Sequence, residues 1–300
     1  FIIAISIFLF FMNYANPVII NENKFFNQEF PDKKKIYLLG SSYVGQIDAN
    51  IINDNIHFFN DDYLVYNLAI HSDSPTKRIG TIDEIIKTKP DIVMYGIPLS
   101  HLGESKLKSH SSFEIQQYFE KIFSMNEFMD IRQTPRDITL DFVLSLIMHS
   151  NISERDQFNP FYPQNIPVMS KIDTNMELEE IMKSIQTSNI DNIPNYDINK
   201  KAIALESIFQ KLKHAEIEII VFTTPYSRVY LEHTNPKVID EFFSLLNTLT
   251  SKYDIKVYDL QNKYADLEIW SGVSHVAYNN EKSIIYSEDI GKIILKEIGN

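Results

Sequence analysis

The chain has 300 residues, enough for one large α/β domain or for one core with a sizeable insertion. It contains no cysteine, which excludes disulfides, thiolate nucleophiles and cysteine-bound metal centres. A formal net charge of −12 argues against nucleic acid as a partner, because binding phosphates requires a basic surface. The contents of 44% hydrophobic and 12% aromatic residues are typical of a globular protein with a buried core.

The N-terminal stretch FIIAISIFLFFM (1–12) is uninterrupted apolar sequence. A bilayer core takes about 20 residues to cross, but the chain begins with Phe, so we expect a fragment that starts inside a longer apolar segment. We predict a membrane anchor or signal segment over 1–20 and favour the anchor, since no small-residue cleavage site is apparent. A buried core helix is the alternative. After a polar linker (21–34), the anchored domain would lie outside the cytoplasm.

Five short apolar runs follow in the rest of the chain. Each has about 5–8 residues, is rich in Ile, Val, Leu and Tyr, and lacks strict alternation, a pattern typical of parallel strands covered on both faces. The runs are IYLLG (36–40), YLVYNLAI (63–70), DIVMYGI (91–97), IEIIVFTT (217–224) and IKVYDL (255–260).

Segments with helical spacing separate these runs. They are 44–52, 75–87, 200–214, 238–249 and 287–298. This alternation predicts βαβ units and a doubly wound, five-stranded parallel sheet of flavodoxin-like order 2-1-3-4-5, within one domain over 35–300. Residues 102–198 break the rhythm, and we expect them to be an insertion after the third strand, mostly helix and loop. It could be a lid, a substrate-selecting cap or a plain structural appendage.

Polar side chains gather where the predicted strands end, the edge at which open parallel sheets bind ligands. Ser41 and Ser42 follow the first strand, Ser72 the second and Ser100 the third, while His275 lies in a loop before the last helix. A serine in a tight strand-to-helix turn projects its hydroxyl over the sheet edge, beside free N–H groups of the helix. The alternative is that Ser41 or Ser42 only caps that helix.

A metal site is the other chemistry considered at this edge. His71, His101 and Asp73 all follow predicted strands, but no two of them have a zinc-like spacing on one helix. We therefore expect neither a metal nor another cofactor.

Four blocks of the sequence, read together, resemble the SGNH/GDSL hydrolase superfamily over about 35–100 and 200–299. KIYLLGSSYVGQI (35–47) resembles the block that carries the nucleophilic serine, and YNLAIHSDS (66–74) resembles the second block, which supplies an oxyanion-hole glycine. PDIVMYGIPLSH (90–101) and WSGVSHVAYNN (270–280) resemble the third block and the Asp-x-x-His block.

The resemblance implies a role for each matching residue. Ser42 would be the nucleophile and His275 the base, while Ser42, Ser72 and Ser100 would form the oxyanion hole. Ser72 replaces the usual glycine, and Ser100 takes the Asn position only after a two-residue shift from Pro98.

The usual acid is missing, because Gly272 occupies the Asp position of the Asp-x-x-His block. The remaining Ser–His dyad predicts that Asp266, Glu268 or a backbone carbonyl orients the imidazole. We expect a serine esterase or O-acyltransferase that acts on a small-molecule or glycan acyl ester, with acyl esters of cell-surface carbohydrate as the expected substrates. The alternative is a surface protein that keeps the scaffold as a binding module without catalysis.

Overall fold

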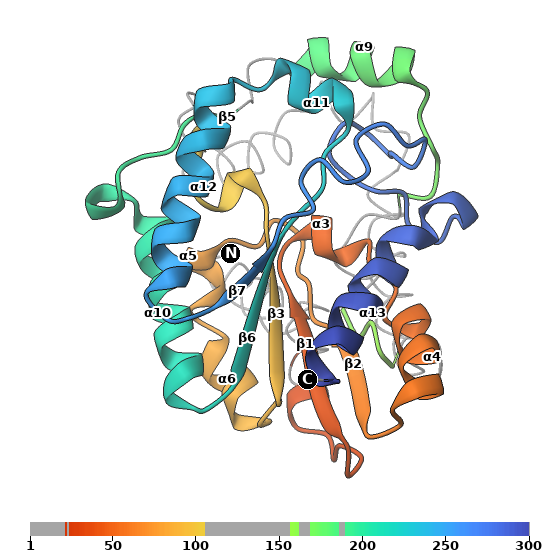
Figure 1. The fold of residues 1–300 in the computed structure, drawn as a ribbon, viewed down its shortest axis with the longest axis vertical. Coiled ribbons are helices and arrows are strands. Elements are labelled where there is room, and N and C mark those ends of the chain that lie inside the picture. The colour runs from red at the N-terminus through yellow and green to blue at the C-terminus, as the bar shows by residue number, and fades with distance from the viewer. Residues whose placement is uncertain (1–21, 23, 106–156, 162–168, 186–189, 300) are drawn as a thin grey trace, which may run out of the picture.

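The computed structural model describes residue 22 and residues 24–105, 157–161, 169–185 and 190–299, and its centre is one five-stranded sheet (Figure 1). All four strand pairings in this sheet are parallel. The strands follow one another across the sheet as β2 (Tyr63–Asn67), β1 (Lys34–Leu39), β3 (Ile92–Ile97), β6 (Glu218–Thr223) and β7 (Lys256–Tyr258). The five runs therefore form the five strands, and the predicted order 2-1-3-4-5 is confirmed.

The middle of the sheet is buried on both faces, as the unbroken apolar runs predict. Every residue of β2 and β3 is buried, and so are the last four residues of β1. Such strands bury their side chains only if helices cover both faces.

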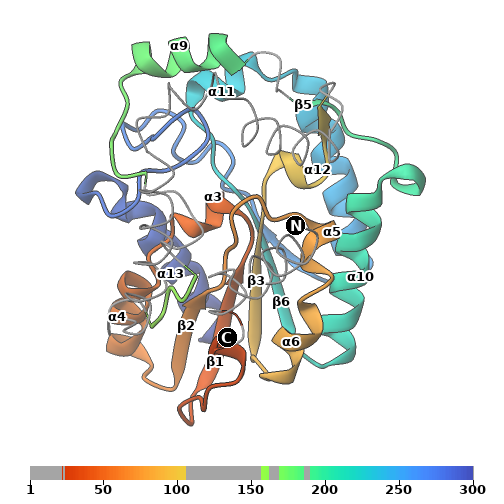
Figure 2. The ribbon, with the colours of Figure 1, turned by 180° about the vertical axis from the view of Figure 1, so that it is seen from behind.

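Two helices cover one face of the sheet and a larger group covers the other (Figures 1 and 2). On the first face α4 (Ala49–Phe59) packs against α13 (Ile284–Ile298). On the second, α10 (Lys200–His214) contacts its neighbours α5 (Pro75–Arg78), α6 (Ile82–Lys87) and α12 (Pro236–Ser251). This two-sided cover is the doubly wound arrangement expected from the sequence.

Two of the predicted helices are broken in the structure. The helix predicted over 44–52 is two helices, α3 (Ser42–Gly45) and α4, because the Asp48 side chain accepts a hydrogen bond from Asn50 N at 2.9 Å and starts a new helix there. The helix predicted over 75–87 likewise divides into α5 and α6. The break leaves α3 as a short turn at the end of β1, with Ser42 as its first residue.

The expected insertion, 102–198, is described only in part. It contributes strand β4 (Glu104–Ser105), which pairs antiparallel with β5 (Ile190–Asn192), and helix α9 (Asn175–Ile185). Helix α9 contacts α11 (Arg228–His233). Both helices lie beyond the same ends of the strands as α3 (Figure 1). This part of the insertion therefore lies at the edge where the sequence places the candidate site.

The predicted N-terminal anchor, 1–20, lies outside the described residues. Among the residues that are described, none of the helices combines the length and apolarity needed to cross a membrane. Within the expected linker, Phe25 is buried and its ring contacts those of Tyr37 and Tyr66, so this part of the linker packs on the domain.

Candidate active site

Ser42 and His275 meet at the carboxyl end of β1. The Ser42 hydroxyl oxygen lies 2.9 Å from His275 Nε2, although 233 residues separate them in sequence. That distance is within hydrogen-bond reach, so Ser42 can donate its proton to the imidazole. The fold therefore makes the contact that the block assignment predicted.

The turn that carries Ser42 depends on two glycines. Gly40 has a φ of 148°, and a Cβ there would lie 2.5 Å from Val44 Cγ2 and 2.9 Å from the Gly96 carbonyl oxygen. A Cβ on Gly96 would lie 2.3 Å from the same Val44 methyl. Only residues without a Cβ allow β1 and β3 to approach α3 this closely. The glycines thus hold Ser42 against the sheet edge.

Neither serine side chain caps α3, which was the alternative to a nucleophilic serine. Ser41 occupies the N-cap of α3, but its buried hydroxyl makes no capping bond and has no partner among the described residues. Ser42 is the first helical residue, and its hydroxyl contacts His275 instead. The adjacent serines therefore have different surroundings.

The other imidazole nitrogen faces a hydroxyl group. With Nε2 accepting from Ser42, Nδ1 carries the proton and lies 3.3 Å from the Ser274 hydroxyl. The Tyr43 ring stacks on the imidazole at a centroid distance of 4.5 Å. Burial raises the pKa of Tyr43, and hydrogen bonds with Ser274 and Tyr226 oppose that rise. A chain of hydroxyl groups therefore takes the place where a triad would have a carboxylate.

Of the three alternatives predicted to orient the imidazole, the two carboxylates are engaged elsewhere, and the partner found at Nδ1 among the described residues is a hydroxyl group and not a backbone carbonyl. Asp266 forms a two-point ion pair with Arg228, at 2.8 and 2.6 Å. Glu268 accepts from Lys282 Nζ at 2.9 Å. Both ion pairs lie at the exposed surface, where water solvates the carboxylates.

Without a carboxylate partner, His275 stays neutral over a wide pH range. Burial, and to a smaller extent the nearby His71, lower the pKa of His275 to about 4. Removing the imidazolium from water disfavours the charged form. The neutral form is the one that can take a proton from Ser42 at neutral pH.

The other two predicted oxyanion-hole residues follow the ends of neighbouring strands: Ser72 lies in the turn after β2 and Ser100 in a short 3-10 helix after β3. Ser72 is exposed and has a φ of 53°, the left-handed conformation that suits the glycine it replaces. Its loop is joined to the serine turn, since Ile70 N donates to Gly40 O at 3.0 Å. Ser100 is half-buried, and its carbonyl accepts from Lys201 Nζ at 2.8 Å. Their role as oxyanion donors stays a prediction.

Asp73 and His101, two of the three residues weighed as metal ligands, are part of a buried cluster with Arg78. Arg78 Nε donates to Asp73 Oδ2 at 2.7 Å, and both side chains are almost fully buried. His101 Nε2 donates to the Asp73 carbonyl at 2.9 Å. This cluster fixes the loop after β2 to the 3-10 helix η1 (Leu99–His101) after β3.

Four residues at the site escaped the sequence reasoning: Tyr43, Ser274, Tyr226 and Asp173. The first two are chain neighbours of Ser42 and His275, so adjacency was an available signal. Tyr226 follows β6, and its hydroxyl accepts from Leu99 N at 2.8 Å. Asp173 Oδ2 accepts from Gly272 N at 2.7 Å, and no local pattern in the insertion points to it.

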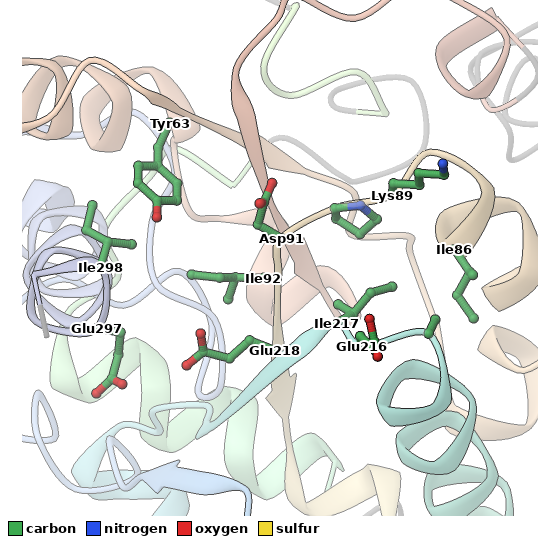
Figure 3. A pocket seen from close by; sticks show the side chains of 12 residues that line it. Tyr63, Ile86, Lys89, Asp91, Ile92, Glu216, Ile217, Glu218, Glu297 and Ile298 are labelled. Atoms are coloured by element: carbon green, nitrogen blue, oxygen red, sulfur yellow. The ribbon is translucent and has the colours of Figure 1, made fainter.

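A hollow of about 710 Å³ lies at the opposite edge of the sheet (Figure 3). Its lining includes the first residues of three strands: Tyr63 of β2, Ile92 of β3 and Glu218 of β6. Open parallel sheets bind ligands at the other edge, beyond the carboxyl ends of the strands. We therefore place the candidate site at Ser42 and His275 and not in this hollow.

Comparison with known proteins gives matches among solved structures only; no protein-family model and no curated protein matches the sequence. A provisionally assigned acylhydrolase from Bacteroides fragilis has 12% identity and a TM-score of 0.48, with 95% of this chain and 98% of that chain covered. An acetyl xylan esterase has 10% identity and a TM-score of 0.46, with 88% and 99% covered. A GDSL-like lipase from Bacteroides thetaiotaomicron has 9% identity and a TM-score of 0.44, with 95% and 99% covered.

The sheet order, the glycine–serine turn after β1 and the histidine loop before α13 are the features that the sequence resemblance implied. The chain has a doubly wound α/β fold whose sheet order and Ser42–His275 placement resemble those expected of the SGNH/GDSL hydrolases.

Proposed function

We propose that the protein is a serine-dependent ester hydrolase or O-acyltransferase. The observation that carries this proposal is the 2.9 Å contact between the Ser42 hydroxyl and His275 Nε2. A hydroxyl becomes a useful nucleophile when a neutral base is placed to take its proton, and the lowered pKa of His275 keeps it neutral.

The proposed reaction has two steps. His275 Nε2 takes the Ser42 proton while the oxygen attacks the ester carbonyl, and the imidazolium then gives this proton to the leaving alcohol. The oxyanion formed in between is held by the backbone N–H groups of Ser42 and Ser72, with the Ser100 hydroxyl as a third donor. Water, or a sugar hydroxyl in a transferase, then attacks the acyl-serine with His275 again acting as base.

The hydroxyl chain at Nδ1 supports a slow reaction. A neutral hydroxyl fixes the imidazole tautomer but balances the imidazolium charge less well than a carboxylate. Losing the acid of a triad costs about 10⁴ in kcat in a serine protease, so we expect turnover well below that of a complete triad.

For the substrate we propose an acyl ester of cell-surface carbohydrate. The support is the sequence resemblance to membrane-anchored members of the superfamily, together with the apolar stretch 1–12. That stretch would anchor the protein with its site outside the cytoplasm.

A second function is favoured by one specific observation. Gly272 stands at the Asp position, and within the described part of the chain no carboxylate bonds to the His275 imidazole. A scaffold that has lost the acid could bind an acylated glycan without cleaving it. This binding module is the alternative to the enzyme.

Labelling with a fluorophosphonate separates the two functions. On the full chain in detergent, we expect the wild type to be labelled and Ser42→Ala to be unlabelled. His275→Ala should slow labelling by about 10²-fold or more, because the hydroxyl loses its base. Ser41→Ala is the matched control, since it removes a neighbouring hydroxyl without a described partner, and it should be labelled like the wild type. A folded wild type that resists labelling would instead support the binding module.

A further inference from the structure

The loop that carries His275 is closed on itself. Trp270 and Val276 form an antiparallel bridge, and Ser271 N donates to the His275 carbonyl at 2.8 Å. These two contacts fix the shape of residues 270–276, but neither ties the loop to the rest of the domain. The position of the imidazole over Ser42 therefore depends on what holds the loop from outside.

One side of the loop is held by α11. The Ser227 hydroxyl donates to the Val273 carbonyl at 2.6 Å, and Ser227 N donates to the same oxygen at 3.2 Å. Ser227 is buried and is also the N-cap of α11. This contact grips the loop two residues before His275.

The other side is held by residues 169–173, from the insertion. Asp173 N donates to the Trp270 carbonyl at 2.8 Å, and Tyr278 N donates to the Met169 carbonyl at 2.6 Å. The Asp173 carboxylate accepts from Gly272 N at 2.7 Å. A segment about one hundred residues earlier in the sequence thus runs along the loop from end to end.

The carboxylate of Asp173 suits this contact. Its side chain is only 12% exposed, and its second oxygen pairs with Lys171 Nζ at 2.9 Å. Hydrogen bonds from N–H groups to a carboxylate are roughly twice as strong as those to a neutral acceptor. Gly272 itself has a φ of 71°, so its N–H is presented from a left-handed turn that other residues adopt less readily. Asp173 therefore bonds at the residue where the Asp-x-x-His block would have its own acid.

We propose that Asp173 is a positioning residue for His275, holding the 270–276 loop by its backbone so that the imidazole stays at Ser42. It supplies a carboxylate to the position of the missing acid, but it acts on the Gly272 N–H and not on the imidazole. The expected effect of Asp173 on the labelling rate rests on the proposed function. Its expected effect on the surroundings of His275 is independent of that function.

The test uses three variants of the full chain and two readouts. Asp173→Ala removes the acceptor, and Asp173→Asn keeps an oxygen that can accept from Gly272 N. Lys171→Ala removes the exposed ion-pair partner that Asp173 shares with Glu177. The readouts are the rate of fluorophosphonate labelling and the pKa of His275 measured by NMR. Far-UV circular dichroism and thermal unfolding establish that each variant is folded.

We expect Asp173→Ala to slow labelling by about 10–100-fold, since small misplacements of a catalytic group cost about that much. It should also raise the His275 pKa from about 4 toward its ordinary value of 6.5, because the released loop becomes solvated. Asp173→Asn, which keeps a neutral and weaker acceptor, should slow labelling and raise the His275 pKa less than Asp173→Ala does, and Lys171→Ala should resemble the wild type in both readouts.

Two results would overturn the proposal. One is a folded Asp173→Ala variant with unchanged labelling and an unchanged His275 pKa, which would leave Asp173 a purely structural role. The other is an Asp173→Asn variant as impaired as the alanine variant. If Asp173→Ala does not fold, hydrogen exchange of the Gly272 amide decides: protection in the wild type and in Asp173→Asn supports the clamp, and exchange at the rate of a free amide in the wild type refutes it. An unlabelled wild type counts against the proposed function, and the pKa readout then decides on Asp173 alone.

Discussion

In the proposed mechanism, the protonation of His275 determines the pH range in which Ser42 has a base. Burial lowers the imidazole pKa to about 4, with a smaller contribution from His71. A surface histidine has an ordinary pKa of about 6.5 and loses its function as a base below that pH. The buried imidazole should remain neutral through the mildly acidic range.

We therefore predict a labelling rate for Ser42 that is flat from neutral pH down to about pH 5 and falls with a midpoint near the His275 pKa of about 4. The sign follows from the base mechanism: protonation removes the acceptor for the Ser42 proton, so the rate is lost as pH falls through the folded-state pKa. Labelling rates measured between pH 3.5 and 8 check this. An acid limb centred near pH 6.5 would show that the imidazole is solvated.

At the scale of elements, the contact between α3 and the sheet is the tightest part of the site. Val44, on α3, packs against Gly40 and Gly96 from the ends of two neighbouring strands. A Cβ on Gly96 would also lie 2.7 Å from Phe222 Cζ. Gly96 is therefore closely packed both on the side of Val44 and on the side of Phe222. Close packing of this kind makes small additions of volume costly.

Gly96→Ala should therefore lower the free energy of unfolding by about 1–3 kcal/mol, the usual range for an overpacked core. It should also slow labelling, because relief of the clash moves α3 and with it Ser42. Adding Val44→Ala removes the methyl group that the new Cβ meets, so the double variant should be more stable than the sum of the single changes predicts. Urea unfolding of the four proteins measures the coupling, and strict additivity would contradict this account.

Elements were predicted well from sequence where the signal is periodic. The five strands and α10, over 200–214, agree with their apolar patterns because burial on one or both faces selects those residues. The break between α3 and α4 was not predicted, because capping by the Asp48 side chain overrides an amphipathic pattern that continues across it. The break between α5 and α6 was not predicted either, and the N-cap of α6, Thr81, makes no side-chain capping bond. The pairing of β4 with β5 was also missed, since strands of two and three residues carry too little pattern to detect.

The site was predictable only in part. Ser42 and His275 belong to blocks whose order and strand context fix their place, and the fold brings them together. The partner of Nδ1 and the role of Asp173 depend on which loops touch at the sheet edge. Contacts between segments about one hundred residues apart leave no trace in local composition, so the sequence points only to carboxylates near His275 along the chain, Asp266 and Glu268.

At the scale of the whole molecule, His101 couples stability to acidity. It is 1% exposed, and burial lowers its pKa to about 3, opposed by its hydrogen bond to the Asp73 carbonyl. The unfolded chain takes up a proton near pH 6.5, while the folded chain resists it. The stability contributed by neutral His101 is therefore complete above pH 6.5 and is lost progressively as pH falls toward about 3.

Lowering the pH from 6.5 to 4.5 should accordingly reduce the free energy of unfolding by about 2–3 kcal/mol through His101, at about 1.4 kcal/mol per pH unit. His101→Phe, which keeps an aromatic ring beside Tyr95, should be less stable at neutral pH but should lose less between these two pH values. Urea unfolding at both pH values gives the comparison. Equal losses in the two proteins would show that other groups govern acid stability.

The separation of 233 residues between Ser42 and His275 has a consequence for biosynthesis. The interior strand β1 leaves the ribosome before either of its neighbours, β2 and β3, exists to pair with it. The sheet can assemble as these strands emerge, but Ser42 can contact His275 only after the loop before α13 has been translated. Under the proposed function, every nascent or prematurely terminated chain that stops short of that loop carries a serine without its base, and reactivity would appear only in molecules whose synthesis has passed His275.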